Sequence, residues 1–326
     1  MSAGDAGRRF AVPRPPGSRL PAVVAGGWLL FFAALAPAQP AQVRWRAPAS
    51  APRWFVAAAA AVADPLAGGK TAYAKGEYGR AIEEFQKAVQ ENQGDANAHL
   101  WLARALGRKA ENVNRLHAAF LVGHIRREFE RAVELDPQNL EARADLLEFY
   151  LEAPGAFGGG MDKARAEAEA LRKLSAAEGH WAAARIAEKR KDYGRAEQEL
   201  LAAAAAEPQR TGFYRDLGHF YHRRGRWAEM ENAFRKAGDP KADFYLAAAY
   251  LDQGRNLEEA ERLVKAFLAG PEPARGEEPT RAQGHQLLGQ IYASLGRRES
   301  AEREYRAALA ENPTLKIARE KLARLR

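Results

Sequence analysis

A glycine-rich stretch, residues 155–160, is the first candidate for a ligand-binding site. Gly155 and Gly160 have the G-x-x-x-x-G spacing of a phosphate-binding loop, in which backbone amides wrap phosphate oxygens and a Lys and a Ser or Thr follow. Met161 and Asp162 occupy those two positions here. A phosphate loop also follows a β-strand, whereas the segment before this stretch has helical periodicity. We therefore interpret the glycines as a bend between two helices.

Two histidines form the second candidate for chemistry. His219 and His222 lie three residues apart on a predicted helix, with Asp216 three residues before them, and this spacing could hold a metal ion. Arg215 and Arg223 flank the group and would repel a cation. No further ligand cluster accompanies them, so we interpret both histidines as solvated or groove-lining.

Nothing in the sequence predicts catalysis. The chain has no cysteine, which excludes disulfides, thiolate zinc sites and cysteine nucleophiles. No serine has the context of a nucleophile elbow. The carboxylates lie opposite Lys and Arg on helical faces, where solvation explains them. The sequence therefore predicts no catalytic residue, no cofactor and no metal, and a protein that is not an enzyme.

Composition indicates an all-helical chain that does not bind nucleic acid. Ala, Leu, Glu, Arg and Lys dominate its 326 residues, and strict two-residue alternation is almost absent. The formal net charge is +8, partly because of N-terminal arginines. Along the remaining chain, basic residues alternate with acidic ones and do not cluster, which argues against a nucleic-acid partner.

The N-terminus is typical of an export signal. Arginines precede an apolar run over residues 22–36, and small residues at Ala36 and Ala38 match a signal-peptidase site. We predict that residues 1–38 are a signal peptide and that residues 39–61 form a linker with a possible short capping helix. The mature protein would then be periplasmic or secreted.

Two alternatives remain for this end of the chain. The apolar run could stay uncleaved and anchor the protein to the inner membrane, which would keep the repeats near the membrane. The true start could also lie downstream, so that the second apolar run, residues 54–63, belongs to the signal.

Three segments share a pattern in which a small residue is followed four positions later by a bulky residue and seven positions later by another small residue. The triplets are Ala81/Phe85/Ala88, Ala196/Leu200/Ala203 and Ala301/Tyr305/Ala308. Each triplet lies on one helical face. Upstream of each lies a second helical segment with small or aromatic residues three apart. Because antiparallel helices approach closely only where side chains are small, the pattern predicts helical hairpins with the bulky residue between the two helices.

In this pattern the chain resembles the tetratricopeptide-repeat (TPR) family, whose unit is a helix–turn–helix of about 34 residues. The resemblance covers residues 62–313 and implies an all-α, right-handed superhelical solenoid of about seven units. The units are predicted near residues 62–95, 96–139, 140–176, 177–210, 211–239, 240–281 and 282–315, and residues 314–326 are predicted to form a C-terminal capping helix.

The second and third units depart from the repeat length. The second carries about ten extra residues, and residues 105–129 are predicted to stay helical throughout, which lengthens its helices. In the third, the glycines make a longer turn before a helix that starts near Met161, with Asp162 placed to cap that helix or to stabilise its dipole. These features resemble a subgroup of exported bacterial TPR proteins.

The resemblance implies that the first helix of each unit lines a concave groove that meets the ligand. The groove residues it assigns in the fourth and fifth units are Trp181, Arg185, Lys189, Arg215, His219, His222 and Arg223. In the third unit they are Glu141, Glu148 and Glu152, so the groove is predicted to be acidic early and basic later. Trp181 is expected to be an exposed aromatic anchor, with half-buried packing as the alternative. The Lys and Asn set of the family's carboxylate clamp is absent.

We therefore predict a non-catalytic scaffold that binds a protein or extended peptide with acidic segments. One alternative is a structural subunit that self-associates through its convex face or terminal helix. Another is an enzyme or accessory factor with a site in the second and third units. The pattern indicates neither the partner's identity nor the oligomeric state.

Overall fold

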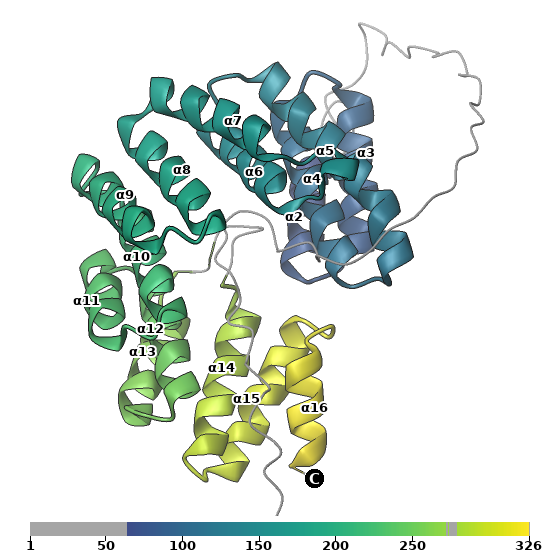
Figure 1. Ribbon diagram of the computed structural model, residues 1–326. Coiled ribbons are helices and arrows are strands. Elements are labelled where there is room, and N and C mark those ends of the chain that lie inside the picture. The colour runs from purple at the N-terminus through teal and green to yellow at the C-terminus, as the bar shows by residue number, and fades with distance from the viewer. Residues whose placement is uncertain (1–63, 272, 274–278, 326) are drawn as a thin grey trace, which may run out of the picture.

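The computed structural model describes residues 64–271, 273 and 279–325 (Figure 1). The predicted signal peptide and linker lie outside the described residues. Over the described ranges the chain forms fifteen α-helices and one 3-10 turn, with no strand. The elements are α2 (Pro65–Ala74), α3 (Tyr78–Glu91), α4 (Ala96–Glu111), α5 (Arg115–Leu135), α6 (Leu140–Glu152), η1 (Gly155–Phe157), α7 (Met161–Leu174), α8 (Ala176–Lys189), α9 (Tyr193–Ala206), α10 (Thr211–Arg223), α11 (Trp227–Ala237), α12 (Pro240–Gln253), α13 (Leu257–Ala269), α14 (Arg281–Ser294), α15 (Arg298–Glu311) and α16 (Lys316–Arg324).

The helices pack as seven hairpins that stack along the chain. Each first helix packs against the second helix that follows it, from α2 with α3 to α14 with α15, and α16 packs against α15. The all-α solenoid of about seven helical hairpins is therefore confirmed.

Glycines in the first helices explain how closely the two helices of a hairpin approach. A methyl group on Gly218 would lie 2.5 Å from the ring of Phe234, and one on Gly289 would lie 2.8 Å from the ring of Tyr305. Both rings are buried. Any larger residue would push the helices apart, so the bulky residue does fill the space between them, as the triplet pattern predicted.

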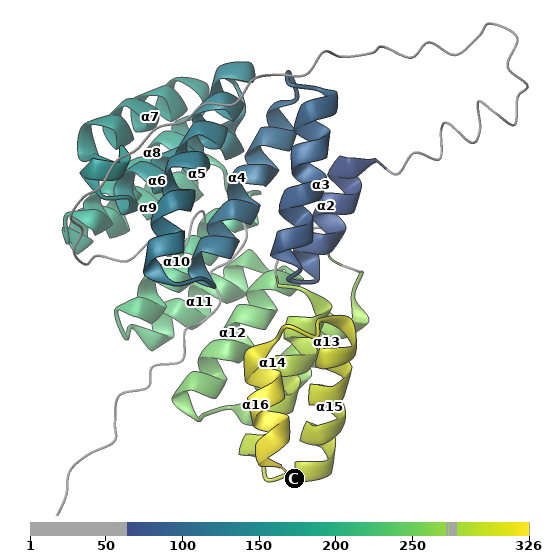
Figure 2. The ribbon, with the colours of Figure 1, turned by 90° about the vertical axis from the view of Figure 1, so that its right-hand side faces the viewer.

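The solenoid is curved, with its first helices on the inside. First helices of neighbouring units contact one another, as α2 does with α4, α6 with α8, and α12 with α14. This contact is expected on the shorter, inner side of a curved stack. The curve brings the two ends of the described chain together (Figures 1 and 2). A side chain at Gly76, between α2 and α3, would lie 2.5 Å from Thr314 Oγ1, which follows α15.

The second unit has long helices, but they are interrupted. Helix α5 has 21 residues and α4 has 16, so the expected lengthening is present. The prediction of helix throughout residues 105–129 is wrong, because α4 ends at Glu111. The side chain of Asn114 accepts a hydrogen bond from the amide of His117 and starts a new helix there.

The glycine-rich stretch forms the predicted turn in the third unit, and α7 begins at Met161. A methyl group on Gly159 would lie 1.9 Å from the carbonyl oxygen of Ala153, so only glycine fits. The amide of Gly160 donates to the carbonyl of Tyr150 at 2.9 Å. This amide therefore holds the turn against α6 and is not presented to a ligand.

Candidate functional site

The predicted groove residues come from two adjacent first helices. Trp181, Arg185 and Lys189 lie on α8, and the remaining four lie on α10. Helix α8 starts where the Ser175 hydroxyl accepts a hydrogen bond from the amide of Glu178 at 3.2 Å. Both helices are inner helices of the solenoid, so their inward faces form the candidate site.

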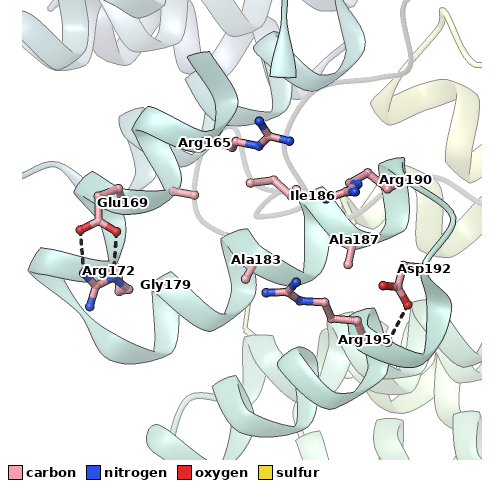
Figure 3. A pocket seen from close by; sticks show the side chains of 11 residues that line it. Arg165, Glu169, Arg172, Gly179, Ala183, Ile186, Ala187, Arg190, Asp192 and Arg195 are labelled. Atoms are coloured by element: carbon pink, nitrogen blue, oxygen red, sulfur yellow. Dashed lines mark hydrogen bonds and ion pairs between the residues drawn. The ribbon is translucent and has the colours of Figure 1, made fainter. Parts of the chain in front are cut away.

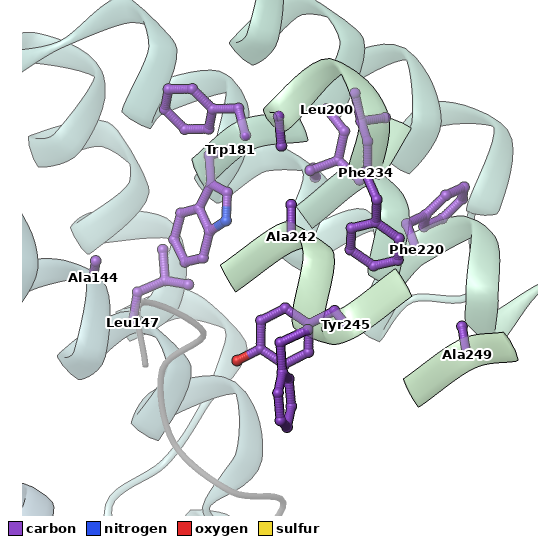
Figure 4. Packing of buried hydrophobic residues seen from close by; sticks show 14 of the residues in the cluster. Ala144, Leu147, Trp181, Leu200, Phe220, Phe234, Ala242, Tyr245 and Ala249 are labelled. Carbon is purple, nitrogen blue, oxygen red and sulfur yellow. The ribbon is translucent and has the colours of Figure 1, made fainter. Parts of the chain in front are cut away.

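Trp181 lies in the hydrophobic core. Only 2% of the residue is exposed, and its indole lies beside Leu147 of α6 (Figure 4). The expectation of an exposed aromatic anchor at Trp181 is thus corrected. The physical reason is that the indole fills the space between α6 and α8, where Ala144 of α6 is small.

Arg185 joins three neighbouring first helices. Its Nε and Nη2 atoms donate to the two carboxylate oxygens of Glu148 on α6, at 2.6 and 3.1 Å, and its Nη1 donates to Glu188. Glu188 also accepts from Arg223 of α10 at 2.6 Å. Burial lowers the pKa of Arg185, but the Glu148 and Glu188 carboxylates raise it by more, so this pKa lies above its ordinary value. Burial raises the pKa of Glu188, and the charges of Arg185 and Arg223 lower it overall.

The same pairing continues on both sides of Arg185. Lys189 of α8 lies 3.4 Å from Glu152 of α6. Arg104 of α4 donates to Asp145 at 2.6 Å and to Glu141 at 2.7 Å, both on α6. The carboxylates of the third unit and the cations of the units beside it are therefore one another's partners. Acidic and basic positions do follow one another along the inner face, but they neutralise each other across the unit boundaries.

The sequence contains a signal for these pairs that the groove assignment missed. Arg104 and Glu141 are 37 residues apart, as are Glu148 and Arg185, and Glu188 and Arg223 are 35 apart. Opposite charges separated by about one repeat lie on the same position of neighbouring first helices. Such a separation predicts an ion pair between units.

On α10, Arg215 is paired with a carboxylate and His219 is buried. Arg215 forms an ion pair with Asp239, which caps α12, and donates to the Thr211 hydroxyl at 2.9 Å. The His219 ring packs edge-on against Tyr245, with ring centroids 4.5 Å apart. Its Nε2 atom is buried and makes no hydrogen bond within the described structure. Burial, followed by the charges of Arg223, His222 and Arg215, holds the pKa of His219 well below its ordinary value.

His222 faces α12. Its Nε2 lies 3.6 Å from the Asp252 carboxylate, and its ring packs edge-on against Trp227. Burial lowers the pKa of His222, Asp252 raises it, and Arg223 lowers it, with a net decrease. Across the described residues, no group of three or more His, Cys, Asp or Glu side chains could hold a metal ion.

Lys189 and Arg223 are the most accessible cations among the predicted residues. Their side chains are 40% and 46% exposed, compared with 25% for Arg185 and 17% for Arg215. The inner face thus offers two exposed cations from neighbouring units, each beside a carboxylate. Such a surface can bind a flexible acidic segment by exchange of ion pairs.

Comparison with known proteins supports the repeat architecture. Residues 282–315 match the family model of the tetratricopeptide repeat. Among curated protein sequences, none matches the chain. No helix within the described ranges has the length and apolar character needed to cross a membrane.

Solved structures of similar fold include yeast Tom70, with 13% identity and a TM-score of 0.50 over 77% of this chain and 51% of that one. The Cut9–Hcn1 hetero-tetramer of the APC/C has 15% identity and a TM-score of 0.44, over 78% of this chain and 47% of that one. YrrB, described as a TPR protein with an unusual peptide-binding site, has 18% identity and a TM-score of 0.36, over 74% of this chain and 98% of that one. The chain thus spans about half the length of the first two proteins. At these identities the likeness concerns the fold alone.

Proposed function

We propose that this tetratricopeptide-repeat protein is a non-catalytic scaffold that binds a protein or an extended peptide along the inner face of its solenoid. The observation that supports this function is the continuity of the inner face. Ion pairs join the first helices of the second to fifth units, from Arg104 on α4 to Arg223 on α10. Stacked repeats held in this way create one extended binding surface.

The exposed cations favour a partner segment that carries carboxylates. Lys189 and Arg223 are each paired with a glutamate, but their side chains remain 40% and 46% exposed. Exposed ion pairs of this kind contribute only about 0–1 kcal/mol each. A ligand carboxylate can pair with the exposed part of Lys189 or Arg223, and affinity must come from several such contacts. Binding should weaken as the salt concentration rises.

The experiment reverses the charge of both exposed side chains in one variant, Lys189→Glu with Arg223→Glu. The matched control is Arg303→Glu on α15, whose guanidinium donates to the Ser300 hydroxyl. Each protein is immobilised, exposed to the exported protein fraction, and its bound partners are quantified by mass spectrometry. We expect a partner captured by the parent and the control to be lost from the double variant, and thermal melting of each protein checks that the double variant is folded. Capture of the same partners by all three proteins contradicts this surface assignment.

We further propose that the protein is exported, with residues 1–38 removed. The basic N-terminus, the apolar run over residues 22–36 and the small residues at Ala36 and Ala38 support this location. N-terminal sequencing of the protein from the periplasmic or secreted fraction should give a start near Gln39. Recovery with membranes, with residue Met1 intact, supports the anchored alternative and contradicts cleavage.

A further inference from the structure

A second groove lies on the outer side of α8, away from the inner face. It is a cavity of about 290 Å³ bounded by α7, α8 and the start of α9. Its floor consists of Ala168 of α7 and of Gly179, Ala183, Ile186 and Ala187 of α8. The groove exists because α8 carries mostly small residues where it faces the space between α7 and α9, so no side chain fills that space (Figure 3).

The outer groove and the inner face use opposite sides of α8. At 100° per residue, Ala183 and Ala187 are each two residues from Arg185 and therefore lie roughly 160° from it around the helix. Between Gly179 and Arg190 the groove follows α8 for about 16 Å. A ligand bound there would not contact the inner ion pairs, so the two surfaces can be tested separately.

Four arginines surround the apolar floor, against two carboxylates. Arg165 and Arg172 come from α7, Arg190 follows α8, and Arg195 comes from α9. In Figure 3 the side chains of Arg165 and Arg195 lie on either side of the floor. Glu169 is paired with Arg172, from which it accepts two hydrogen bonds at 2.9 and 2.6 Å, whereas Asp192 accepts one hydrogen bond from the backbone amide of Arg195 at 3.2 Å and keeps its charge.

The remaining positive charge is available to a ligand. Within the described part of the chain, the Arg190 side chain makes no hydrogen bond or ion pair. Arg165 pairs with Asp162 at 3.1 Å and Arg195 with Glu199 at 3.6 Å, and these two arginine side chains are 54% and 62% exposed. Such exposed pairs within one helix contribute little to stability and exchange readily for a ligand's carboxylate.

We propose that this outer groove is a second docking site, for an acidic peptide segment that places small apolar side chains on the floor between its carboxylates. The cations are spread along the groove and do not converge on one point, which fits several carboxylates on an extended chain better than a single anion. The apolar floor between the arginines fits side chains that alternate with those carboxylates. The protein would then hold one partner segment on its inner face and another on its outer face.

The test uses two labelled peptides of eight residues, one alternating Glu with Ala and one alternating Lys with Ala, with binding followed by fluorescence anisotropy. The groove variant is Arg165→Glu with Arg190→Glu, and the control is Arg303→Glu on α15. Binding is compared in proteins that also carry Lys189→Glu and Arg223→Glu, so that the inner-face cations do not contribute. In this background we expect the Glu peptide to bind with and without Arg303→Glu alike, the groove substitutions to weaken its binding roughly tenfold or more, and the Lys peptide not to bind. Circular dichroism melting checks that the groove variant keeps its fold, which the exposure of both arginines predicts.

Three outcomes would overturn the proposal. One is equal binding of the Glu peptide with and without the groove substitutions in that background. Another is loss of binding in the inner-face variant, Lys189→Glu with Arg223→Glu, while the groove variant still binds. The last is tighter binding of a single-stranded RNA oligonucleotide than of the Glu peptide with the same dependence on Arg165 and Arg190, because the groove would then recognise phosphates.

Discussion

Arg185 shows how a side chain predicted to meet a ligand can instead hold two repeats together. Its main partner, Glu148, has a side chain that is only 2% exposed. Removing one partner of a buried pair leaves an uncompensated charge and costs about 3–5 kcal/mol, whereas an exposed pair contributes about 0–1 kcal/mol. The burial of Glu148 therefore decides that Arg185 stabilises the fold.

Replacing Arg185 by alanine should destabilise the protein strongly. Since Arg185 itself is partly exposed, we expect a loss of about 2–4 kcal/mol in the free energy of unfolding. The matched control is Arg80→Ala, which removes a 3.4 Å pair whose arginine side chain is 68% exposed, and it should change stability by at most about 1 kcal/mol. Urea unfolding measures both. Equal effects would mean that the pair with Glu148 is not buried in solution.

His219 should make the fold sensitive to mild acid. Its pKa in the folded protein lies well below its ordinary value, because burial disfavours the charged ring. Below about pH 6.5 the unfolded chain therefore binds a proton that the folded chain resists, and stability falls as the pH falls. We expect unfolding free energies measured at about pH 7.5 and about pH 5.5, on either side of that value, to differ less in His219→Leu than in the parent. An unchanged difference would assign the pH dependence to other groups, with His222 the next candidate because its pKa is also lowered.

The turn of the third unit sets how α6 and α7 meet through its backbone geometry. Gly158 has φ of +86°, and the Gly159 position leaves no room for a side chain beside the Ala153 carbonyl. Gly155, in contrast, has nothing within 4 Å of an added methyl group. The glycines of one turn therefore have different physical roles.

Gly159→Ala should destabilise the protein, and Gly155→Ala should not. A methyl group at Gly159 conflicts with backbone, which cannot rotate away as a side chain can, so we expect a loss of about 1–3 kcal/mol. At Gly155 the change should lie within about 1 kcal/mol, because the methyl group meets open space and the substitution also restricts the unfolded chain. Thermal unfolding of the two variants provides the comparison, and equal stability of both would contradict the packed turn.

At the scale of the whole molecule, the curvature brings the first and last hairpins into contact. Gly76 faces Thr314 and Asn312, and Asn312 is 6% exposed. The described hairpins therefore form a nearly closed arc around the inner face.

Gly76→Ala should loosen this contact. Alanine at a positive φ costs roughly 1–2 kcal/mol by itself, so the control must carry the same strain. Gly296→Ala is suitable, because Gly296 has φ of +73°, close to the +72° of Gly76, and nothing lies within 4 Å of its added methyl group. We expect faster amide exchange over residues 312–316 and a larger radius of gyration in solution scattering for Gly76→Ala only. Identical exchange and scattering in the two variants would show that the ends do not touch in solution.

The sequence by itself determined the fold class and the helical hairpins. The spacing of Ala81, Phe85 and Ala88, repeated along the chain, is a local signal, because a helix brings residues four and seven apart onto one face. The turn before Met161 was equally local, since glycines interrupt a helical pattern wherever they cluster. The local patterns do not predict every helix boundary. The break at residues 112–114 depends on a single capping residue, Asn114, and was not predicted.

Which groove residues are available to a ligand depends on the tertiary structure and could not be predicted from the sequence. Trp181 and His219 have the position of groove residues in the sequence, but their exposure depends on how closely α6, α8, α10 and α12 approach. Arg185 forms an ion pair with Glu148, which is 37 residues away in the sequence, and no local pattern predicts whether such a pair is buried or solvated. The contact of Gly76 with Thr314 depends on the curvature summed over all seven hairpins. Exposure and long-range pairing arise from packing between units, which local periodicity does not encode.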